Sequence, residues 1–263
     1  MADRPRRKKF FASSVLYYPN STRCLNFSRL ILLSGDVELN PGMVDQRKSG
    51  CVKNLKMAHL NIRSLKNRGH YIEVKNLVSE NDFDILTISE TWLNGSSEIV
   101  IPGYTIKRLD RKNKTGGVKE IYKVEQLSKL SSISSGGFHQ LWLGIQINKH
   151  KSFIVCTAYR PPDCSLDCFD QELSESFTSA MTLSKDIFIL GDLNCNVLDT
   201  SDGNARPLLD FCLAFNLTQV IKQPTRCTDL SKTLIDVILV SNMHLVKSSG
   251  VQPVSISDHD LSL

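Results

Sequence analysis

The succession of short apolar runs that begins at Asn54 constrains the fold most strongly. Each run is long enough for one strand and is separated from the next by polar turn residues. Stretches with helical spacing lie between some of these runs, and such a mixture is typical of layered α/β proteins. The strands predicted from the runs are 55–62, 84–90, 141–147, 152–159, 186–190 and 233–241.

Three segments carry apolar residues at helical spacing, and one of them begins after Asn204, a candidate cap, with Pro207 in its first turn. The other two are 71–81, with the sequence YIEVKNLVSEN, and 167–183, where Phe169, Leu173 and Phe177 share one face. The chain has 263 residues, of which 41% are apolar, and this is enough to bury a substantial core. We therefore expect one folded domain over 53–263, in which only 116–137 shows no clear pattern.

The first 52 residues differ from the rest and are expected to form a disordered basic leader. They include the tract RPRRKK, which carries much of the excess positive charge in a chain whose net charge is +5. The remainder is close to neutral, so the charge indicates a basic arm and does not by itself establish a polyanionic partner.

Several classes of protein are disfavoured by composition. No run approaches the ~20 apolar residues that span a bilayer, and LILLSG in the leader lacks the clean cleavage site of a secretory signal. The chain has eight cysteines and no CxxC pair, so a zinc site is disfavoured. We expect reduced thiols in an intracellular protein that is not secreted.

Polar side chains follow several of the predicted strands at the point where each strand ends. Because strand ends in a layered α/β protein meet at one edge, these side chains are expected to lie close together. Carboxylate and amide oxygens suit Mg²⁺, or Mn²⁺, rather than zinc. The residues concerned are Asn61, Glu90, Asp192, Asn194, Asp258 and His259.

A histidine beside such a metal site can act as a general base on water. Asp236 lies within a predicted strand, where an unpaired carboxylate is costly, and a hydrogen bond to His259 would satisfy it and fix the imidazole tautomer. Together these groups suit attack by water on a phosphodiester. Taken singly, each has a plain structural explanation: a turn at GDLN, a cap at Glu90, core packing at Tyr159. Only the ordered set is specific.

The ordered motifs HLNIRSL, ISETWL, AYRPP, ILGDLNCNV, TLIDVILVS and SDH strongly resemble the endonuclease/exonuclease/phosphatase superfamily. YRPP and SETWL resemble the apurinic-type endonuclease domain of non-LTR (LINE-type) retrotransposons in particular. The resemblance covers the chain from about Asn54 to His259. It implies a DNase I-like four-layer α/β sandwich of two packed mixed sheets flanked by helices. It also implies Mg²⁺-dependent nicking of DNA, which leaves a 3′-hydroxyl that primes reverse transcription.

The resemblance also implies roles for individual residues. Asn61, Glu90 and Asp258 would hold the metal, with Glu90 as a direct ligand. Tyr159 would contact the phosphate or polarise the site, and Asn194 would help to bind the scissile phosphate. Asp192 would position or deprotonate the attacking water, and His259 would be oriented by Asp236. Whether Asp192 or His259 is the base stays open.

A second resemblance lies in the leader, where LILLSGDVELNPGM is similar to a 2A-like ribosome-skipping peptide. In that pattern a proline follows Asn-Pro-Gly, and here Met43 stands in its place. Stalling depends on the proline, so we expect little or no skipping and a leader that stays attached.

The family places a strand after the Ser-Asp-His triplet, and only DLSL remains here. We therefore expect a C-terminally truncated domain whose last strand is missing, with His259 on a loosely held terminus and activity reduced. Two alternatives stay open, another phosphoesterase of the same superfamily and a non-catalytic nucleic-acid-binding relic. We also expect that the protein binds DNA, is monomeric and lies in the nucleus, and that the full-length element carries a reverse transcriptase domain.

Overall fold

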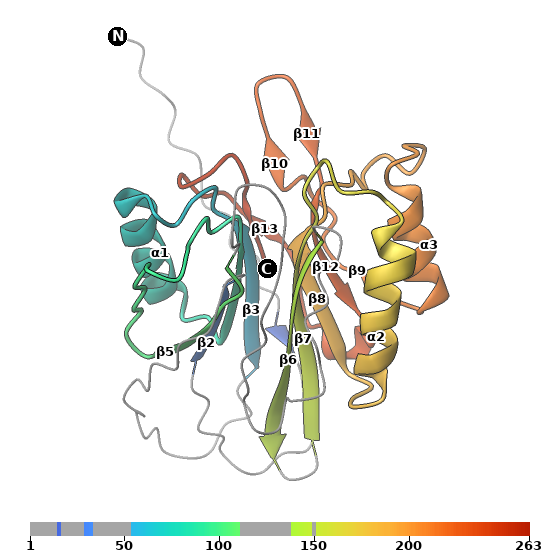
Figure 1. Ribbon diagram of the computed structural model, residues 1–263, viewed down its shortest axis with the longest axis horizontal. Helices are drawn as coiled ribbons and strands as arrows, with labels where there is room; N and C mark the ends of the chain where they lie inside the picture. The colour runs from blue at the N-terminus through green and yellow to red at the C-terminus, as the bar shows by residue number, and fades with distance from the viewer. Residues whose placement is uncertain (1–14, 17–28, 34–53, 111–137, 149–150) are drawn as a thin grey trace.

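The computed structural model describes residues 15–16, 29–33, 54–110, 138–148 and 151–263. Within these residues two β-sheets lie between helices (Figure 1). Helix α1 (Arg68–Asn81) lies on the outer side of one sheet, and α2 (Ser174–Met181) and α3 (Arg206–Ala214) lie on the outer side of the other. Both sheets mix parallel and antiparallel pairs. The four-layer α/β sandwich predicted from the sequence is confirmed.

The first sheet has the strand order β13-β14-β3-β4-β2-β5, with β1 paired to β3. Its central strands β3 and β4 run parallel and are almost wholly buried, because one face contacts α1 and the other faces the second sheet. The strands are β1 (Val15–Leu16), β2 (Arg29–Leu33), β3 (Leu55–Asn61), β4 (Ile85–Ser89), β5 (Tyr104–Lys107), β13 (Val251–Gln252) and β14 (Leu261–Ser262).

The second sheet has the order β6-β7-β8-β12-β9. Strands β8 and β12 are apolar along most of their length and buried at every residue, as expected for strands covered on both faces. The strands are β6 (His139–Asn148), β7 (Lys151–Tyr159), β8 (Ile187–Asp192), β9 (Thr218–Gln219) and β12 (Asp236–Val240). A small hairpin of β10 (Arg226–Cys227) and β11 (Lys232–Thr233) projects beyond the sheets (Figure 1).

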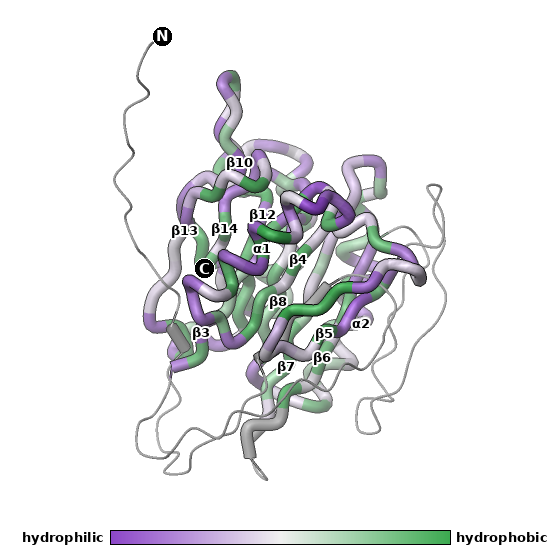
Figure 2. Tube along the Cα trace, turned by 90° about the vertical axis from the view of Figure 1, so that its left-hand side faces the viewer, coloured by the Kyte–Doolittle hydropathy of each residue, from purple (hydrophilic) through white to green (hydrophobic). Residues whose placement is uncertain are grey.

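Apolar side chains fill the spaces between the layers. The helical segment expected at 167–183 begins as a π-helical turn, Phe169–Leu173, and continues as α2, so that Phe177 packs against Trp142 of β6 and Phe211 of α3. A short 3₁₀ helix, Met243–Leu245, follows β12. Figure 2 shows hydrophobic residues along the inner strands and mainly hydrophilic residues in the loops around them. Among the described residues no helix is long and apolar enough to cross a membrane.

The expectation that the strand after the Ser-Asp-His triplet is missing is wrong. Leu261–Ser262 forms β14, which pairs with β3 at His59 and with β13. The backbones of Leu263 and Gly250 exchange two hydrogen bonds, at 2.9 and 3.0 Å. These pairings also hold His259, which is 4% exposed, so the expectation of a loosely held histidine is wrong as well. Two residues suffice for a strand here because the neighbouring strands supply the partners.

The expectation of an unfolded leader does not hold for two of its segments. Val15–Leu16 pairs with β3, and Arg29–Leu33 lies between β4 and β5 with parallel pairing to both. The backbone of an apolar run such as LILL can pair with neighbouring strands and so extend a sheet. The hydrophobic pattern of the leader alone does not show where such pairing occurs. The rest of the leader, with Met43 and the 2A-like motif beyond its first residues LILL, lies outside the described residues, as does all of 116–137. The domain boundary near residue 53 stays a prediction.

Gly191 of β8 offers a test of the packing between strands. A Cβ built on this residue would lie 1.9 Å from the carbonyl oxygen of Ala158 on β7. Gly191→Ala is therefore expected to lower the free energy of unfolding by about 2 kcal/mol or more. Gly203→Ala is the matched control, because nothing lies within 4 Å of its Cβ position. Urea unfolding of the two variants measures the difference, and equal stabilities would contradict this packing.

Candidate active site

Strand register brings three of the predicted residues into one row at an edge of the second sheet. Tyr159 and Asp192 are the last residues of the parallel strands β7 and β8 and pair with each other. Asp236, the first residue of β12, pairs with Asp192 from the other side. These three candidate residues therefore lie side by side at one edge of the sheet.

Asn61 connects this row to the first sheet. It is the last residue of β3 and is fully buried. Its Nδ2 donates to Glu90 Oε1 at 2.8 Å and to Asp192 Oδ2 at 2.7 Å, so these two carboxylate oxygens lie at most 5.5 Å apart, the sum of the two distances. Asn61 Oδ1 accepts from the backbone N–H of Arg63. One amide therefore joins acidic groups that are distant in the sequence.

Glu90 receives a second hydrogen bond from the other sheet. The hydroxyl of Tyr159 donates to Glu90 Oε1 at 3.1 Å. Glu90 follows β4 in a left-handed backbone conformation, with φ of 51°, which is uncommon for this residue type. Backbone strain of this kind persists where surrounding contacts hold it, and it clusters at functional sites.

Asp192 is nearly inaccessible to solvent and lies beside another carboxylate. Burial, followed by the negative charge of Asp236, raises the pKa of Asp192 to about 7; the charge of His259 and the hydrogen bonds from Asn61 and the backbone of Asn194 act in the opposite direction. Two buried carboxylates at adjacent positions favour either a shared proton or a bound cation.

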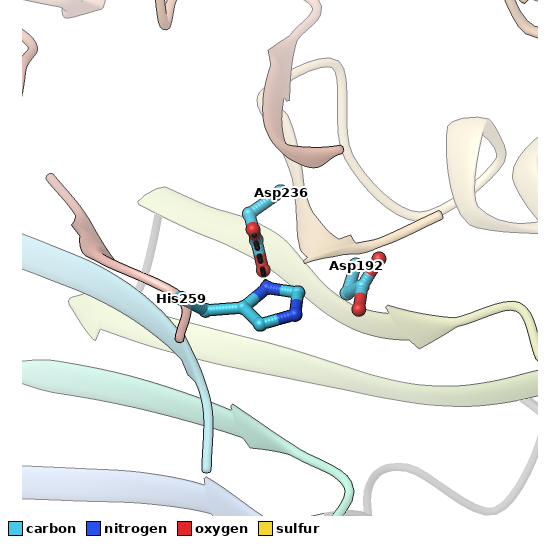
Figure 3. Close-up of side chains that lie close together, drawn as sticks. All are labelled: Asp192, Asp236 and His259. Atoms are coloured by element: carbon cyan, nitrogen blue, oxygen red, sulfur yellow. Dashed lines mark hydrogen bonds and ion pairs between the residues drawn. The ribbon is translucent and has the colours of Figure 1, made fainter. Parts of the chain in front are cut away.

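His259 lies between the two aspartates (Figure 3). Its Nδ1 bonds to Asp236 Oδ2 at 2.8 Å, and the other ring nitrogen faces Asp192. Burial lowers the pKa of His259, but the hydrogen bond to Asp236 and the charges of Asp236, Asp192 and Asp258 outweigh burial and raise it above its usual value. Because an ionised carboxylate only accepts, Asp236 fixes the tautomer with hydrogen on Nδ1 and leaves Nε2 to accept a proton.

A second histidine that sequence reasoning missed lies behind Asp236. His59 is fully buried, and its Nδ1 lies 2.8 Å from Thr87 Oγ1. The Thr87 hydroxyl hydrogen goes to the carbonyl of Ala58, so His59 Nδ1 must be the donor. Burial lowers the pKa of His59 to about 4, with Asp236 acting against that effect and His259 adding to it. The ring is therefore neutral at pH 7, and the 3.8 Å between His59 Nε2 and Asp236 Oδ1 is not an ion pair.

The loop after β8 is held by a buried arginine that was also missed. The guanidinium of Arg160 donates to the backbone carbonyls of Leu193, Cys164 and Asn194. In return Asn194 Nδ2 donates to the carbonyl of Arg160 at 2.9 Å, with Asn194 in the left-handed region at φ of 49°. Asn194 is thus positioned beside Asp192, whose Oδ1 accepts from its backbone N–H.

Asp258 differs from the other predicted residues because arginines occupy both its oxygens. Oδ1 accepts from Arg63 at 3.0 Å and Oδ2 from Arg226 at 2.8 Å. Burial raises the pKa of Asp258, but the hydrogen bonds from Arg226 and Arg63 and the charge of His259 outweigh it and lower that pKa to about 2. The predicted role of Asp258 as a metal ligand stays a prediction, and the arginines compete with a metal for its oxygens.

The donor set at this edge fits a divalent cation. Asp192, Asp236 and His259 are all buried and offer ligand atoms within 4.8 Å of one another. Asp236 Oδ1 is buried and, within the described part of the chain, has no hydrogen-bond partner. A cation would offset the repulsion between the carboxylates, and oxygen donors suit Mg²⁺ or Mn²⁺.

Local sequence signals could have identified part of what was missed. His59 lies two residues before Asn61, so in a strand both side chains point to the same face. Arg160 directly follows Tyr159 in YRPP. The contacts of Arg63 and Arg226 with Asp258 carry no such signal, because they join segments that are far apart in the chain.

Known proteins resemble this chain in sequence pattern and in fold. Residues 153–263 match the family model described as Endonuclease-reverse transcriptase. The endonuclease domain of TRAS1, a telomere-specific non-LTR retrotransposon, has a similar structure, with a TM-score of 0.52, 13% identity, and coverage of 79% of this chain and 95% of that one. A 3′-5′ exonuclease, NExo, from Neisseria meningitidis gives a TM-score of 0.47 at 16% identity, covering 78% of this chain and 97% of that one. No curated protein matched the chain in sequence.

The low pKa of His59 predicts a pH dependence of stability. In the unfolded chain its pKa is near 6.5, so between pH 6.5 and 4 only the unfolded state takes up the proton, and stability falls as pH falls through this window. The loss from this group is at most about 3 kcal/mol. Between pH 6.5 and 4 the free energy of unfolding of His59→Gln, measured in urea, should therefore fall by less than that of the parent, the difference being this contribution of His59. Parallel pH profiles for the two proteins would contradict a neutral buried histidine.

Proposed function

We propose that this chain belongs to the endonuclease/exonuclease/phosphatase superfamily and that it nicks DNA by Mg²⁺-dependent hydrolysis of a phosphodiester. The match of residues 153–263 to the family model described as Endonuclease-reverse transcriptase supports this proposal. The product would carry a 3′-hydroxyl from which a polymerase can extend. The observation that carries the proposal is the meeting of Glu90 and Asp192 at the Asn61 amide, directly beside the Asp236–His259 pair.

Glu90 and Asp192 would hold the cation at the junction of the two sheets, and Asn61, whose Nδ2 donates to both, would orient them. The predicted ligand role of Asn61 needs its Oδ1, which here accepts from the backbone N–H of Arg63. Glu90 is half-buried and so reachable from solvent, and it lies next to Asp192 across the amide. Bound there, Mg²⁺ supplies positive charge against the negative charge that develops on the phosphate oxygens. Tyr159 fixes Glu90 Oε1 from the opposite sheet.

Asp236, His259 and Asp192 would handle the proton of the attacking water. The Asp236 carboxylate holds His259 with Nε2 free of a hydrogen, and Nε2 faces Asp192 (Figure 3). A water between these two groups can give its proton to either of them. The pKa of Asp192 is raised to about 7 by burial and the charge of Asp236, and the pKa of His259, despite its burial, is raised above its usual value by its hydrogen bond to Asp236 and the surrounding carboxylates.

Arg63 and Arg226, which both bond to Asp258, would bind the phosphate backbone next to the site. Their side chains are 53% and 40% exposed, and Asp258 holds both in place while leaving guanidinium donors facing solvent. We infer that Asp258 acts through these arginines in addition to its predicted role near the metal. Asn194, fixed by Arg160, would contact the scissile phosphate itself.

Two other functions remain as outcomes of the tests below. Hydrolysis of small phosphomonoesters with intact plasmid would indicate another phosphoesterase. Binding that persists in EDTA without cleavage, and is lost on removal of Arg4–Lys9, would indicate a binding relic. A nuclear location, a monomer, and a reverse transcriptase domain in the full-length element follow from the proposed chemistry and stay predictions.

Asp192→Asn should reduce nicking of supercoiled plasmid in Mg²⁺ about 10²- to 10⁴-fold, because the variant loses the carboxylate that positions the attacking water or accepts its proton. Conversion to open-circular plasmid measures the rate, and primer extension from the nick tests for the 3′-hydroxyl. Asp199→Asn, an exposed aspartate on a loop, is the matched control and should nick as the parent does. Equal nicking by the parent and Asp192→Asn would contradict the proposal.

Glu90→Gln should weaken Mn²⁺ binding at least tenfold in calorimetric titration, since the cation loses a charged ligand. His259→Ala should bind Mn²⁺ with an affinity close to the parent if the histidine handles the proton and not the metal. If His259→Ala instead weakens Mn²⁺ binding tenfold and Glu90→Gln binds as the parent does, the cation is bound by the Asp192–Asp236–His259 cluster and not at Glu90.

Asp236→Asn should lower kcat about 10²- to 10⁴-fold with little change in KM. The amide can donate to Nδ1 and so favours the wrong imidazole tautomer. Nicking rates at several plasmid concentrations separate the two constants. An unchanged kcat would show that His259 does not take part in proton transfer.

A further inference from the structure

An exposed tryptophan lies next to the acidic junction and has no role in the chemistry described so far. Trp92 follows Glu90 by two residues, and its side chain is 54% exposed. Tryptophan is a large aromatic that proteins usually bury for most of its surface. Among the described residues no ring or cation contact involving Trp92 is found, so its indole is open to a ligand.

The backbone holds Trp92 outward at a conformational cost. Its φ is 54°, in the left-handed region that bulky residues rarely adopt. The flanking residues Thr91 and Leu93 are both 3% exposed and anchored inward. Non-glycine residues with positive φ also occur in the facing loop, at Arg63 and Ser64. Strain of this kind gathers where a side chain must be presented at a functional site.

The segment that carries Trp92 is also rigid. On one side, the backbone N–H groups of Ser64 and Leu65 donate to the carbonyls of Glu90 and Thr91, each at 2.8 Å. On the other side, the guanidinium of Arg108 donates to the carbonyls of Asn94 at 2.7 Å and Ser97 at 2.6 Å. An aromatic on such a fixed loop loses little conformational freedom when it binds a flat partner.

The chemistry beside Trp92 indicates what that partner is. Arg63, whose loop is hydrogen-bonded to the segment that carries Trp92, suits a phosphate chain. Proteins stack on nucleobases by placing an exposed aromatic beside cationic groups of this kind. A small phosphomonoester or a sugar phosphate offers no comparable flat face. We propose that Trp92 stacks on a nucleobase of the cleaved strand next to the scissile phosphate, and that this contact directs the site toward base-bearing nucleic acid.

This inference rests on the proposed function for its substrate, but binding tests it separately from cleavage. The probes are a single-stranded thymidine oligonucleotide and an abasic deoxyribose-phosphate oligomer of the same length, both in EDTA so that no cleavage occurs. The chain has two tryptophans, and Trp142 is 4% exposed, so it serves as an internal reference. Trp92 fluorescence should be quenched by the thymidine oligonucleotide and unchanged by the abasic oligomer.

Variants separate stacking from general binding. Trp92→Ala should weaken binding of the thymidine oligonucleotide about 5- to 150-fold and leave binding of the abasic oligomer unchanged. Trp92→Phe keeps an aromatic face, so it should retain most of the affinity while the quenching signal disappears. Leu213→Ala, at an 80% exposed site on α3, is the control for loss of exposed apolar surface and should bind both oligomers as the parent does.

Equal quenching by both oligomers, or equal affinity of Trp92→Ala and the parent for the thymidine oligonucleotide, would overturn the inference. If either of these two results is found while Asp192→Asn still abolishes nicking, the nuclease proposal is retained and the stacking role of Trp92 is rejected. If base-dependent quenching is found in a protein that does not nick, the stacking role stands and the nuclease proposal falls. Circular dichroism of each variant checks that it is folded.

Discussion

The site depends on one buried amide that ties the two sheets together. Asn61 Nδ2 donates to a carboxylate from each sheet, Glu90 from the first and Asp192 from the second. A buried amide without such partners would be costly, and each carboxylate without a donor would be costlier still. Apolar burial drives the packing of the two sheets, and this contact, together with the hydrogen bond from Tyr159 to Glu90, fixes how they are aligned at the site. The acidic groups converge for the same reason.

The electrostatics of the junction follow from that convergence. Asp192 and Asp236 are adjacent across paired strands, and burial leaves their charge little solvent to screen it. His259 relieves part of the repulsion from one side through its bond to Asp236. His59 does not, since it is neutral and presents a lone pair. The site as a whole carries excess negative charge, which suits a cation and a phosphate that arrives with it.

Much of the fold and of the site could be predicted from local pattern. The buried runs that became β3, β4, β7, β8 and β12 are short, apolar and bounded by turns, and each acid or amide at their ends could be named. Prediction from the sequence failed for elements that are very short and for contacts between residues far apart in the chain. The two-residue β14 has no pattern of its own and exists because β3 and β13 pair with it. The arginine partners of Asp258 and the insertion of Arg29–Leu33 between β4 and β5 likewise depend on tertiary contacts.

We propose that oxygens from both sheets, from Glu90 and Asp192, hold one divalent cation at the Asn61 junction. Crystals soaked in Mn²⁺ test it most directly, because manganese scatters anomalously and its position can be found without assumptions about the reaction. We expect an anomalous peak within about 2.0–2.6 Å of a Glu90 oxygen, on the side of the Asn61 amide that faces Asp192. A peak found only away from this junction, or none in a crystal that binds Mn²⁺ elsewhere, would contradict it.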